Sequence, residues 1–259
     1  PGYFEVPIKK GESIVFSAGT EETKSVSLKQ RFTRELKKRP GRFSFIDLLK
    51  NASQQFVLHQ KNIADVIAGF PWYKSITRQT FIALPGLEQA LNNEKTCTTI
   101  LDSYLSHLKN GMFPDHIHDS NPVFHSADSA LWFIWAIQKY YNPKTGLTET
   151  WEKYGSAVKD ILEAYRNSSM GYYGMTKEYL IYAEKDQTAL TWMNSYAFGK
   201  PAVQRGGMPV EINALWYNAI CFALEAAQKT GDTQFADRWK DIKKNVANSF
   251  LKTFWSEGH

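Results

Sequence analysis

Apolar residues recur every three to four positions through most of this 259-residue sequence, and that spacing limits its fold more than any other feature. The spacing predicts eight helices, at residues 21–38, 43–58, 78–91, 94–109, 126–141, 148–166, 210–229 and 233–254. Short polar connections such as Thr230-Gly231-Asp232 separate several of these segments, so we expect consecutive helices to pack antiparallel as hairpins. The chain is therefore predicted to be all-α.

The first 20 residues follow a different pattern. Residues 3–8 and 13–16 are short β-prone runs on either side of Lys9-Lys10-Gly11-Glu12, which predicts a short β-hairpin at the N-terminus. We expect residues 1–20 to be this hairpin or a linker left from a preceding β-rich domain, and residues 21–259 to form one helical domain. The sequence begins with proline, so a processed chain or a piece of a longer one is expected.

Composition excludes several classes of protein. Hydrophobic residues make up 43% of the chain, which is enough for a large core. No apolar run approaches the roughly 18 residues that a membrane-spanning helix needs, so no membrane span is predicted. The two cysteines, Cys97 and Cys221, lie far apart in predicted helices, which excludes a disulfide framework and a cysteine-based zinc site. We expect both thiols to be buried.

The formal net charge of +5 is concentrated in one segment, because residues 24–42 hold eight basic residues and a single acidic one. Leu28, Phe32 and Leu36 recur there at helical spacing, which predicts an inward apolar face and a solvated basic face. A basic stripe can also bind phosphates. Stacking aromatic residues are not interleaved with these charges as single-strand binders require, so no nucleic-acid partner is predicted.

Three long polar connections are predicted, at residues 59–77, 110–125 and 167–209, and each is rich in Trp, Tyr, His, Asn and Asp. Loops of this length in a compact helical domain are usually functional, and we expect them to line a concave pocket at one end of the stacked helices. Such a pocket suits a sugar, because a pyranose stacks on aromatic rings while polar side chains take its hydroxyls. The tryptophans at or near loop ends are Trp72, Trp132, Trp135, Trp192 and Trp216, and ordinary core packing is the alternative for each.

Three groups of residues, in order along the chain, resemble the signatures of one family. The first combines Ala52-Ser53-Gln54-Gln55-Phe56-Val57 with Ile67-Ala68-Gly69-Phe70-Pro71-Trp72-Tyr73 and Thr77-Arg78-Gln79-Thr80-Phe81-Ile82-Ala83-Leu84-Pro85-Gly86-Leu87. The second combines Gly111-Met112-Phe113-Pro114-Asp115 with Ser126-Ala127-Asp128-Ser129-Ala130-Leu131-Trp132-Phe133. The third combines Leu190-Thr191-Trp192-Met193-Asn194 with Pro209-Val210-Glu211-Ile212-Asn213-Ala214-Leu215-Trp216-Tyr217-Asn218-Ala219. From about residue 21 to 255 the chain resembles the C-terminal domain of glycogen debranching enzyme, an amylo-α-1,6-glucosidase.

The resemblance implies a fold and an activity. It implies an (α/α)6 toroid of helical hairpins, the six-hairpin glycosidase type, in a cytoplasmic enzyme that hydrolyses α-1,6-linked glucose in α-glucans with inversion. Its partner is then an α-glucan or oligosaccharide, and neither a cofactor nor a metal is implied. A closed ring has twelve helices, so the toroid is expected to be incomplete, with one of the family's catalytic carboxylates beyond residue 259.

The resemblance also implies roles for single residues. It places Asn194 at the position of the family's general acid and Gln79 at that of an aspartate. An amide hydrogen-bonds sugar hydroxyls but cannot protonate a leaving oxygen. Hydrolysis would therefore require another acid, for which Glu184, Asp186 and Glu211 are the nearby carboxyls, and Glu211 is the catalytic candidate that matches a motif. The implied substrate-binding residues are Trp72, Tyr73, Arg78, Gln79, Asp128, Trp132, Trp192 and Glu211. The structural alternatives are an ion pair of Arg78 with Asp128 or Glu211, a helix cap for Asp128, and a first-turn helix position for Glu211.

Two functions remain open from the sequence. The first is a debranching-type glycoside hydrolase whose acid and base positions are altered or lie outside this chain. The alternative is a catalytically inactive glucan-binding or regulatory domain derived from that family, because both departures replace a carboxyl with its amide. His116 and His118 would share one side of an extended run, but three firm ligands are not visible, so no metal site is predicted.

Overall fold

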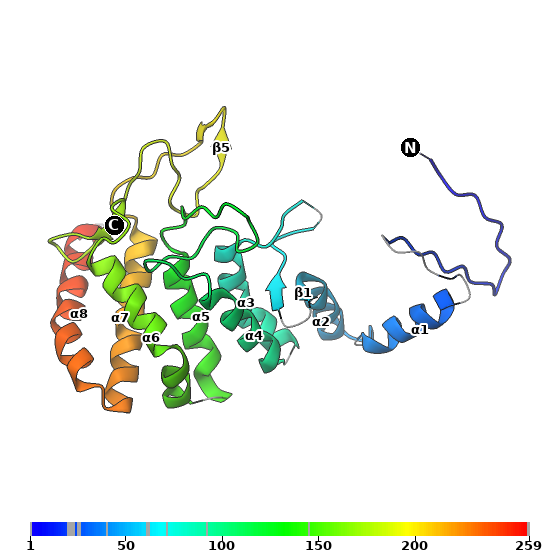
Figure 1. The fold of residues 1–259 in the computed structure, drawn as a ribbon, viewed down its shortest axis with the longest axis horizontal. Helices are drawn as coiled ribbons and strands as arrows, with labels where there is room; N and C mark the ends of the chain where they lie inside the picture. The colour runs from blue at the N-terminus through cyan, green and yellow to red at the C-terminus, as the bar shows by residue number, and fades with distance from the viewer. Residues whose placement is uncertain are drawn as a thin grey trace. The chain divides into compact units, whose positions relative to one another are not determined.

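Figure 1 shows the chain in a computed structural model that describes residues 2–19, 24, 27–39, 41–60, 63–70, 72–91, 93–144 and 146–257. Its contacts divide it into two compact units, Pro1–Gln54 and Gln55–His259. Within the described residues the regular elements are eight helices and three antiparallel strand pairs, which confirms the all-α prediction. Part of the first predicted helix, residues 21–23 and 25–26, lies outside the described residues.

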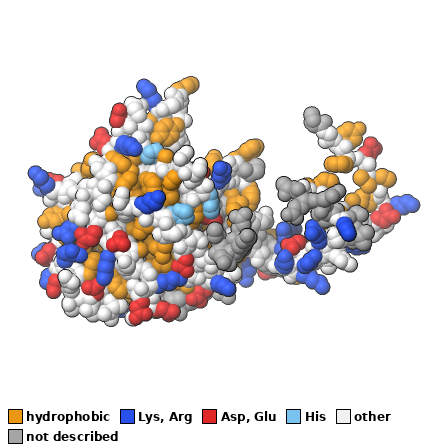
Figure 2. Space-filling view, in the orientation of Figure 1, with side chains coloured by type: hydrophobic (Ala, Val, Ile, Leu, Met, Phe, Trp, Pro, Cys, Tyr) orange, Lys and Arg blue, Asp and Glu red, His pale blue; other side chains and the backbone are white. Residues whose placement is uncertain are grey.

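The first unit contains α1 (Leu28–Lys38) and most of α2 (Phe45–Phe56). Figure 2 shows Lys and Arg side chains clustered over α1. Within this fully described helix no side chain is buried, and Phe32 and Leu36 are 51% and 53% exposed. The inward apolar face predicted for this segment is therefore not formed. α2 begins at a reciprocal cap, because the Ser44 N–H donates to Asp47 Oδ2 and the Asp47 N–H donates to Ser44 Oγ.

Residues 2–19 reverse direction between Lys9 and Glu12, where the Glu12 N–H donates to the Lys9 carbonyl at 3.0 Å. Gly11 lies in this turn with a φ of 90°, a conformation that glycine adopts without strain. The rings of Phe4 and Phe16 meet across the turn with centroids 5.4 Å apart. This is the reversal that the predicted hairpin needs, although its arms form no regular ladder within residues 2–19. An isolated two-stranded hairpin is marginal in water, because it buries too little apolar surface.

The second unit is a row of helical hairpins. Its helices are α3 (Thr77–Leu91), α4 (Glu94–Leu105), α5 (Ser129–Lys144), α6 (Leu147–Arg166), α7 (Val210–Thr230) and α8 (Thr233–Phe254). α5 packs against both α3 and α7, and α4, α6 and α8 each pack against the helix that precedes them in the chain. Figure 1 shows the paired helices side by side, as the short connections predicted. The pattern is one row of α3, α5 and α7 with a partner helix for each.

Local sequence sets the ends of these helices. The Asn93 side chain accepts the Thr96 N–H at 3.1 Å at the start of α4, and the Asp232 side chain accepts the Phe235 N–H at 3.2 Å at the start of α8. Gly231 ends α7 with a φ of 76°, which lets the chain turn back within two residues. None of the described helices is long and apolar enough to cross a membrane.

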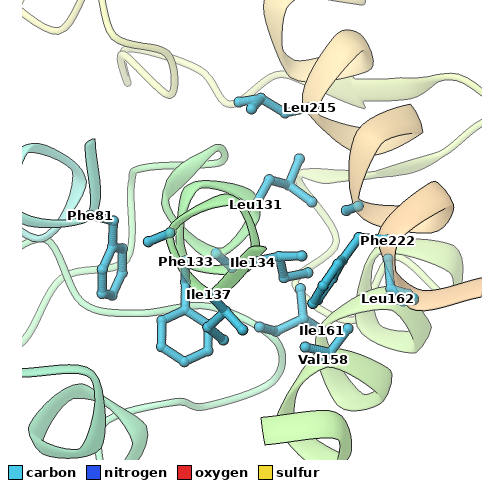
Figure 3. Close-up of a cluster of buried hydrophobic side chains, with 14 of the residues drawn as sticks. Phe81, Leu131, Phe133, Ile134, Ile137, Val158, Ile161, Leu162, Leu215 and Phe222 are labelled. Atoms are coloured by element: carbon cyan, nitrogen blue, oxygen red, sulfur yellow. The ribbon is translucent and has the colours of Figure 1, made fainter. Parts of the chain in front are cut away.

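The core of the second unit lies between α3, α5, α6 and α7. Figure 3 shows Phe133 and Ile137 of α5 between Phe81 of α3 and residues of α6 and α7 that include Ile161 and Phe222. The Phe81 ring lies 5.1 Å from that of Phe133, and both side chains are 0% exposed. Truncating such a ring to alanine typically costs about 3–5 kcal/mol. The packing of this core therefore fixes the helix ends from which the long connections extend.

Neither cysteine is part of a disulfide, and the prediction of a buried thiol is confirmed for Cys97. Cys221 is partly exposed, so the prediction was wrong for that residue. It lies on α7, where the buried stripe includes Ile220 and Phe222 but leaves its side chain at the margin. A half-exposed position follows from the 100° step between successive helical residues.

The long connections contain short strand pairs that the periodicity did not predict. The strands are β1 (Val57–Gln60), β2 (Ile63–Val66), β3 (Tyr173–Met175), β4 (Ile181–Ala183), β5 (Tyr196–Ala197) and β6 (Lys200–Pro201), paired β1–β2, β3–β4 and β5–β6. Runs of two to four residues are too short to show a twofold alternation in the sequence. Figure 1 shows these connections, including β5, gathered at one end of the helices.

Candidate functional site

The polar residues of the three motifs lie where α3, α5 and α7 begin. Arg78 is the second residue of α3, Asp128 immediately precedes α5, and Glu211 is the second residue of α7. Each of these helices is followed by an antiparallel partner, so all three begin at the same end of the row, beside the long connections (Figure 1). The fold therefore places the motif residues at the loop end of the helices.

Arg78 and Asp128 form a buried ion pair that joins the first motif to the second. Arg78 Nε donates to Asp128 Oδ1 at 2.8 Å and to Oδ2 at 2.9 Å, and the residues are 3% and 1% exposed. Trp132, one turn into α5, donates from Nε1 to Asp128 Oδ2 at 3.2 Å. Burial raises the pKa of Asp128, while the Arg78 charge acts in the opposite direction. This ion pair with Asp128 is one of the two structural alternatives to substrate binding that the sequence left open for Arg78.

The second motif is also joined to the third, through Ala127. The Ala127 N–H donates to the Leu190 carbonyl at 2.9 Å, and the Ala127 carbonyl accepts the Tyr165 hydroxyl at 2.6 Å. The Tyr165 ring stacks on Trp216, with centroids 5.9 Å apart and planes 18° apart. Trp216 is 0% exposed, so it is a core tryptophan, which was the alternative for this residue.

Residues 190–194 combine an anchored backbone with exposed side chains. The Leu190 carbonyl holds the start of α5, and the Thr191 side chain is 1% exposed with its Oγ1 accepting the Met193 N–H at 3.3 Å. The indole of Trp192 is nevertheless 56% exposed, and Asn194 is exposed as well. A stacking surface and an amide are thus presented to solvent on a fixed segment.

Glu211 forms a two-point ion pair with Arg205. Arg205 Nη1 donates to Oε1 at 2.5 Å and Nη2 to Oε2 at 2.9 Å, with the two side chains about one quarter exposed. Asn213, one turn into the same helix, accepts the Ile181 N–H at 2.6 Å and donates to the Pro209 carbonyl at 2.9 Å. These contacts fix the start of α7 against β4, so the Glu211 carboxylate has a defined position.

The first motif supplies an aromatic turn before α3. The Tyr73 N–H donates to the Gly69 carbonyl at 2.9 Å, which closes a tight turn, and Trp72 and Tyr73 are 84% and 62% exposed. Gln79 is exposed beside the buried Arg78, so successive residues of α3 face solvent and core. Trp132 is half-buried and meets Trp135 edge to face, with ring centroids 5.4 Å apart.

The contacts of the predicted residues therefore fall into three groups. Arg78 and Trp132 both donate hydrogen bonds to Asp128. Trp192 and Asn194 lie just after Leu190, whose carbonyl accepts the Ala127 N–H, and Glu211 pairs with Arg205. Sequence reasoning missed Arg205 and Tyr165. Arg205 lies in a connection where no periodicity applies, and Tyr165 reads as an ordinary apolar-face residue of α6.

The histidines that were weighed as metal ligands each contact a protein group. His116 Nδ1 lies 2.8 Å from the Ser75 carbonyl, and His118 Nε2 lies 2.8 Å from Asp65 Oδ2. In the part of the chain that the structure describes, no group of three His, Cys, Asp or Glu side chains is arranged to hold a metal ion. The contacts of His116 and His118 therefore hold the 110–125 connection against the segment before α3.

Comparison with protein families identifies the family of this chain. A family model described as amylo-alpha-1,6-glucosidase matches residues 51–259, which include the three motifs and the whole second unit from Gln55 onward. No curated protein matches the chain. The matched region contains the Arg78–Asp128 pair, the Ala127–Leu190 hydrogen bond and the Arg205–Glu211 pair.

Proposed function

The chain belongs to the amylo-alpha-1,6-glucosidase family, and on that premise we propose that it binds an α-glucan at the loop end of α3, α5 and α7. We propose further that it does so as the helical-toroid domain of a debranching-type glycoside hydrolase that acts on α-1,6-linked glucose. The observation that carries this proposal is the joining of the motifs at one end of the helices. The Arg78–Asp128 pair links the first to the second, and the Ala127–Leu190 hydrogen bond links the second to the third.

Binding would depend on aromatic rings whose backbones are already fixed. Trp72 and Trp192 are exposed, but each lies on a turn or segment held by backbone hydrogen bonds. A sugar that stacks on such a ring orders few additional bonds, so less conformational entropy opposes binding. The amides of Gln79 and Asn194 are exposed and offer both a donor and an acceptor to sugar hydroxyls.

Hydrolysis would need an acid and a base on opposite sides of the bond. In an inverting glycosidase the two carboxyls are roughly 6.5–9.5 Å apart, with a water between the base and the sugar. Glu211, which is ion-paired with Arg205, suits the base, because an ionised carboxylate accepts the proton of the attacking water. Asn194 cannot supply the acid.

We propose Glu184 as the acid that acts in place of Asn194. Glu184 is exposed, and its side chain lies against Gly206, where an added Cβ would come within 2.9 Å of the Glu184 Cδ. Gly206 follows Arg205 directly, so Glu184 lies beside the segment that holds Glu211. Asp186 is also exposed and is the neighbouring carboxyl that serves as a control.

The test is glucose release from an α-1,6-branched dextrin, measured beside binding of the same dextrin by isothermal titration. We expect Glu211→Gln and Glu184→Gln each to lose release by about 100-fold or more, a size typical of acid–base groups, with binding retained. Asp186→Asn, the matched control, should keep both. Undiminished release by Glu211→Gln would remove Glu211 from the mechanism, and undiminished release by Glu184→Gln would remove Glu184.

A second candidate function is a glucan-binding or regulatory domain without catalysis. The observation that favours it is the pair of exposed amides, Gln79 and Asn194, at positions where the family resemblance implies carboxyls. Amides retain hydrogen bonding to hydroxyls but cannot transfer a proton. The same experiment separates the two functions: binding without any release by the unmodified protein supports this candidate, and release refutes it.

A further inference from the structure

Asp65, on β2, is a buried carboxylate outside the motifs. It is 2% exposed, and three donors surround it: the Val66 N–H at 2.7 Å and the Tyr104 hydroxyl at 2.9 Å contact Oδ1, and His118 Nε2 contacts Oδ2 at 2.8 Å. Tyr104 of α4 is 0% exposed, and its hydroxyl also lies 3.1 Å from Thr80 Oγ1. Burying a carboxylate is costly unless its oxygens are hydrogen-bonded, so this cluster is a built arrangement and not a chance contact.

The cluster fixes the orientation of His118. An ionised carboxylate only accepts hydrogen bonds, so the proton between Asp65 and the neutral ring must be on His118 Nε2. The other ring nitrogen, Nδ1, is then left as an acceptor. The His118 side chain is 52% exposed although its partner Asp65 is buried. A half-exposed imidazole with a defined tautomer is suited to accept a hydrogen bond from a ligand.

Hydrogen bonds join the segment of His118 to the segment that follows the aromatic turn. The Thr77 N–H donates to the Asp115 carbonyl at 3.0 Å, Thr77 Oγ1 donates to the Pro114 carbonyl at 2.5 Å, and His116 Nδ1 lies 2.8 Å from the Ser75 carbonyl. Together with the Asp65–His118 contact, these bonds hold residues 114–118 against Asp65, Ser75 and Thr77. The four contacts fix the position of His118 relative to these residues.

Aromatic side chains are exposed just before Ser75 and Thr77, the residues that these hydrogen bonds hold. Phe70, Trp72 and Tyr73 are 52%, 84% and 62% exposed, and the Phe70 ring packs on Phe56 with centroids 5.4 Å apart. Apolar rings beside a polar acceptor are what a sugar requires, because its faces are CH groups and its rim is hydroxyls.

We propose that His118 is a sugar-binding residue whose Nδ1 accepts a hydrogen bond from a hydroxyl of a glucose unit stacked on the aromatic turn of Phe70, Trp72 and Tyr73. Asp65 and Tyr104 are positioning residues that act through the His118 ring. The inference rests on the proposed function, because it assumes an α-glucan ligand, and it adds a residue that the motifs do not contain. It also explains why a carboxylate is buried beneath an exposed histidine.

The test is NMR of the ¹⁵N-labelled histidine ring nitrogens, combined with titration of panose, a trisaccharide of glucose with one α-1,6 bond. We expect the neutral His118 ring to carry its proton on Nε2, and panose to shift its Nδ1 signal with the same Kd that isothermal titration gives. Losing one hydrogen bond weakens binding by about fivefold to tenfold, so His118→Gln should show that loss. Glutamine can still donate to Asp65, which keeps the segment in place.

Positioning variants complete the design. Asp65→Asn should give a mixture of His118 tautomers and a similar loss of affinity. Asp102→Asn is the matched control, because it likewise replaces a carboxylate that accepts a tyrosine hydroxyl, that of Tyr154 at 3.0 Å, and should leave affinity unchanged. If panose binding depends on Trp72 but shifts no Nδ1 signal, and His118→Gln keeps full affinity, the inference about His118 is overturned while the proposed function stands. If the unmodified protein does not bind panose at all, the proposed function fails and the inference fails with it.

Discussion

Replacing Asp128 with asparagine tests the buried ion pair that holds the first two motifs together. Asparagine keeps the size of the side chain but removes its charge. Arg78 is 3% exposed, and its Nη2 has no hydrogen-bond partner among the described residues, so the guanidinium would then be buried without the Asp128 counter-charge. Breaking a buried pair in this way typically costs about 3–5 kcal/mol, which is a large part of the roughly 5–15 kcal/mol that stabilises a folded domain.

Urea unfolding followed by circular dichroism measures this loss. With a slope of about 3 kcal/mol per molar urea, the midpoint of Asp128→Asn should fall by about 1–1.7 M. Two controls test the explanation. Asp237→Asn removes an exposed ion pair with Lys240 and should leave the midpoint unchanged, because solvent already screens that pair.

The second control is the double variant Arg78→Met/Asp128→Leu. It replaces both charges with apolar groups of similar size and should recover most of the lost stability, since neither charge is then left unpaired. A loss below about 1 kcal/mol in Asp128→Asn would refute the reasoning. The reasoning would also be refuted if the double variant lost as much stability as the sum of the losses in Arg78→Met and Asp128→Leu, because the cost would then come from packing and not from an unpaired charge.

Three further predictions concern other parts of the second unit. Gly111→Ala should destabilise the protein by about 2–4 kcal/mol in the same urea assay, because its φ is 74° and an added Cβ would collide with Ala164 Cβ. The control Gly171→Ala should lose only about 1 kcal/mol, because its φ of 76° is similar but an added Cβ would meet no other atom. Burial raises the pKa of Tyr154 above the value near 10 of an unfolded chain, so its contribution to stability is fully present below about pH 10 and is lost as the pH rises above it. Tyr154→Phe should therefore lose less stability than the unmodified protein when urea unfolding is repeated across this pH range. Asn194→Asp should increase glucose release from a branched dextrin if residue 194 lies at the scissile bond, and unchanged release would place it elsewhere.

Helices with strong end signals could be predicted closely from the sequence. α7 and α8 match their predicted ranges to within one residue, because Pro209, Gly231 and Asp232 each fix a helix end locally. α1 shows the limit of the same reasoning. Its apolar residues have the right spacing for a buried face, but Phe32 and Leu36 are exposed, since periodicity shows that a face exists and not what covers it.

The candidate site was predicted in part. The Arg78–Asp128 pair was foreseen as one of two ion pairs, because both residues lie at helix starts that hairpin packing brings to one end. The pairing of Glu211 with Arg205 and of His118 with Asp65 was not foreseen. Those contacts depend on how long connections fold over one another, and loop geometry leaves no period in the sequence.

The central claim is that the aromatic turn before α3 and the segment of Trp192 bind the same glucan. Protein labelled with 5-fluorotryptophan gives a separate ¹⁹F signal for each of its eight tryptophans. We predict that panose or a longer branched dextrin shifts the Trp72 and Trp192 signals with one common Kd. Trp255, which is 68% exposed, and the buried Trp239 should stay in place. Signals of Trp72 and Trp192 that do not move, or that move no more than that of Trp255, would contradict the account.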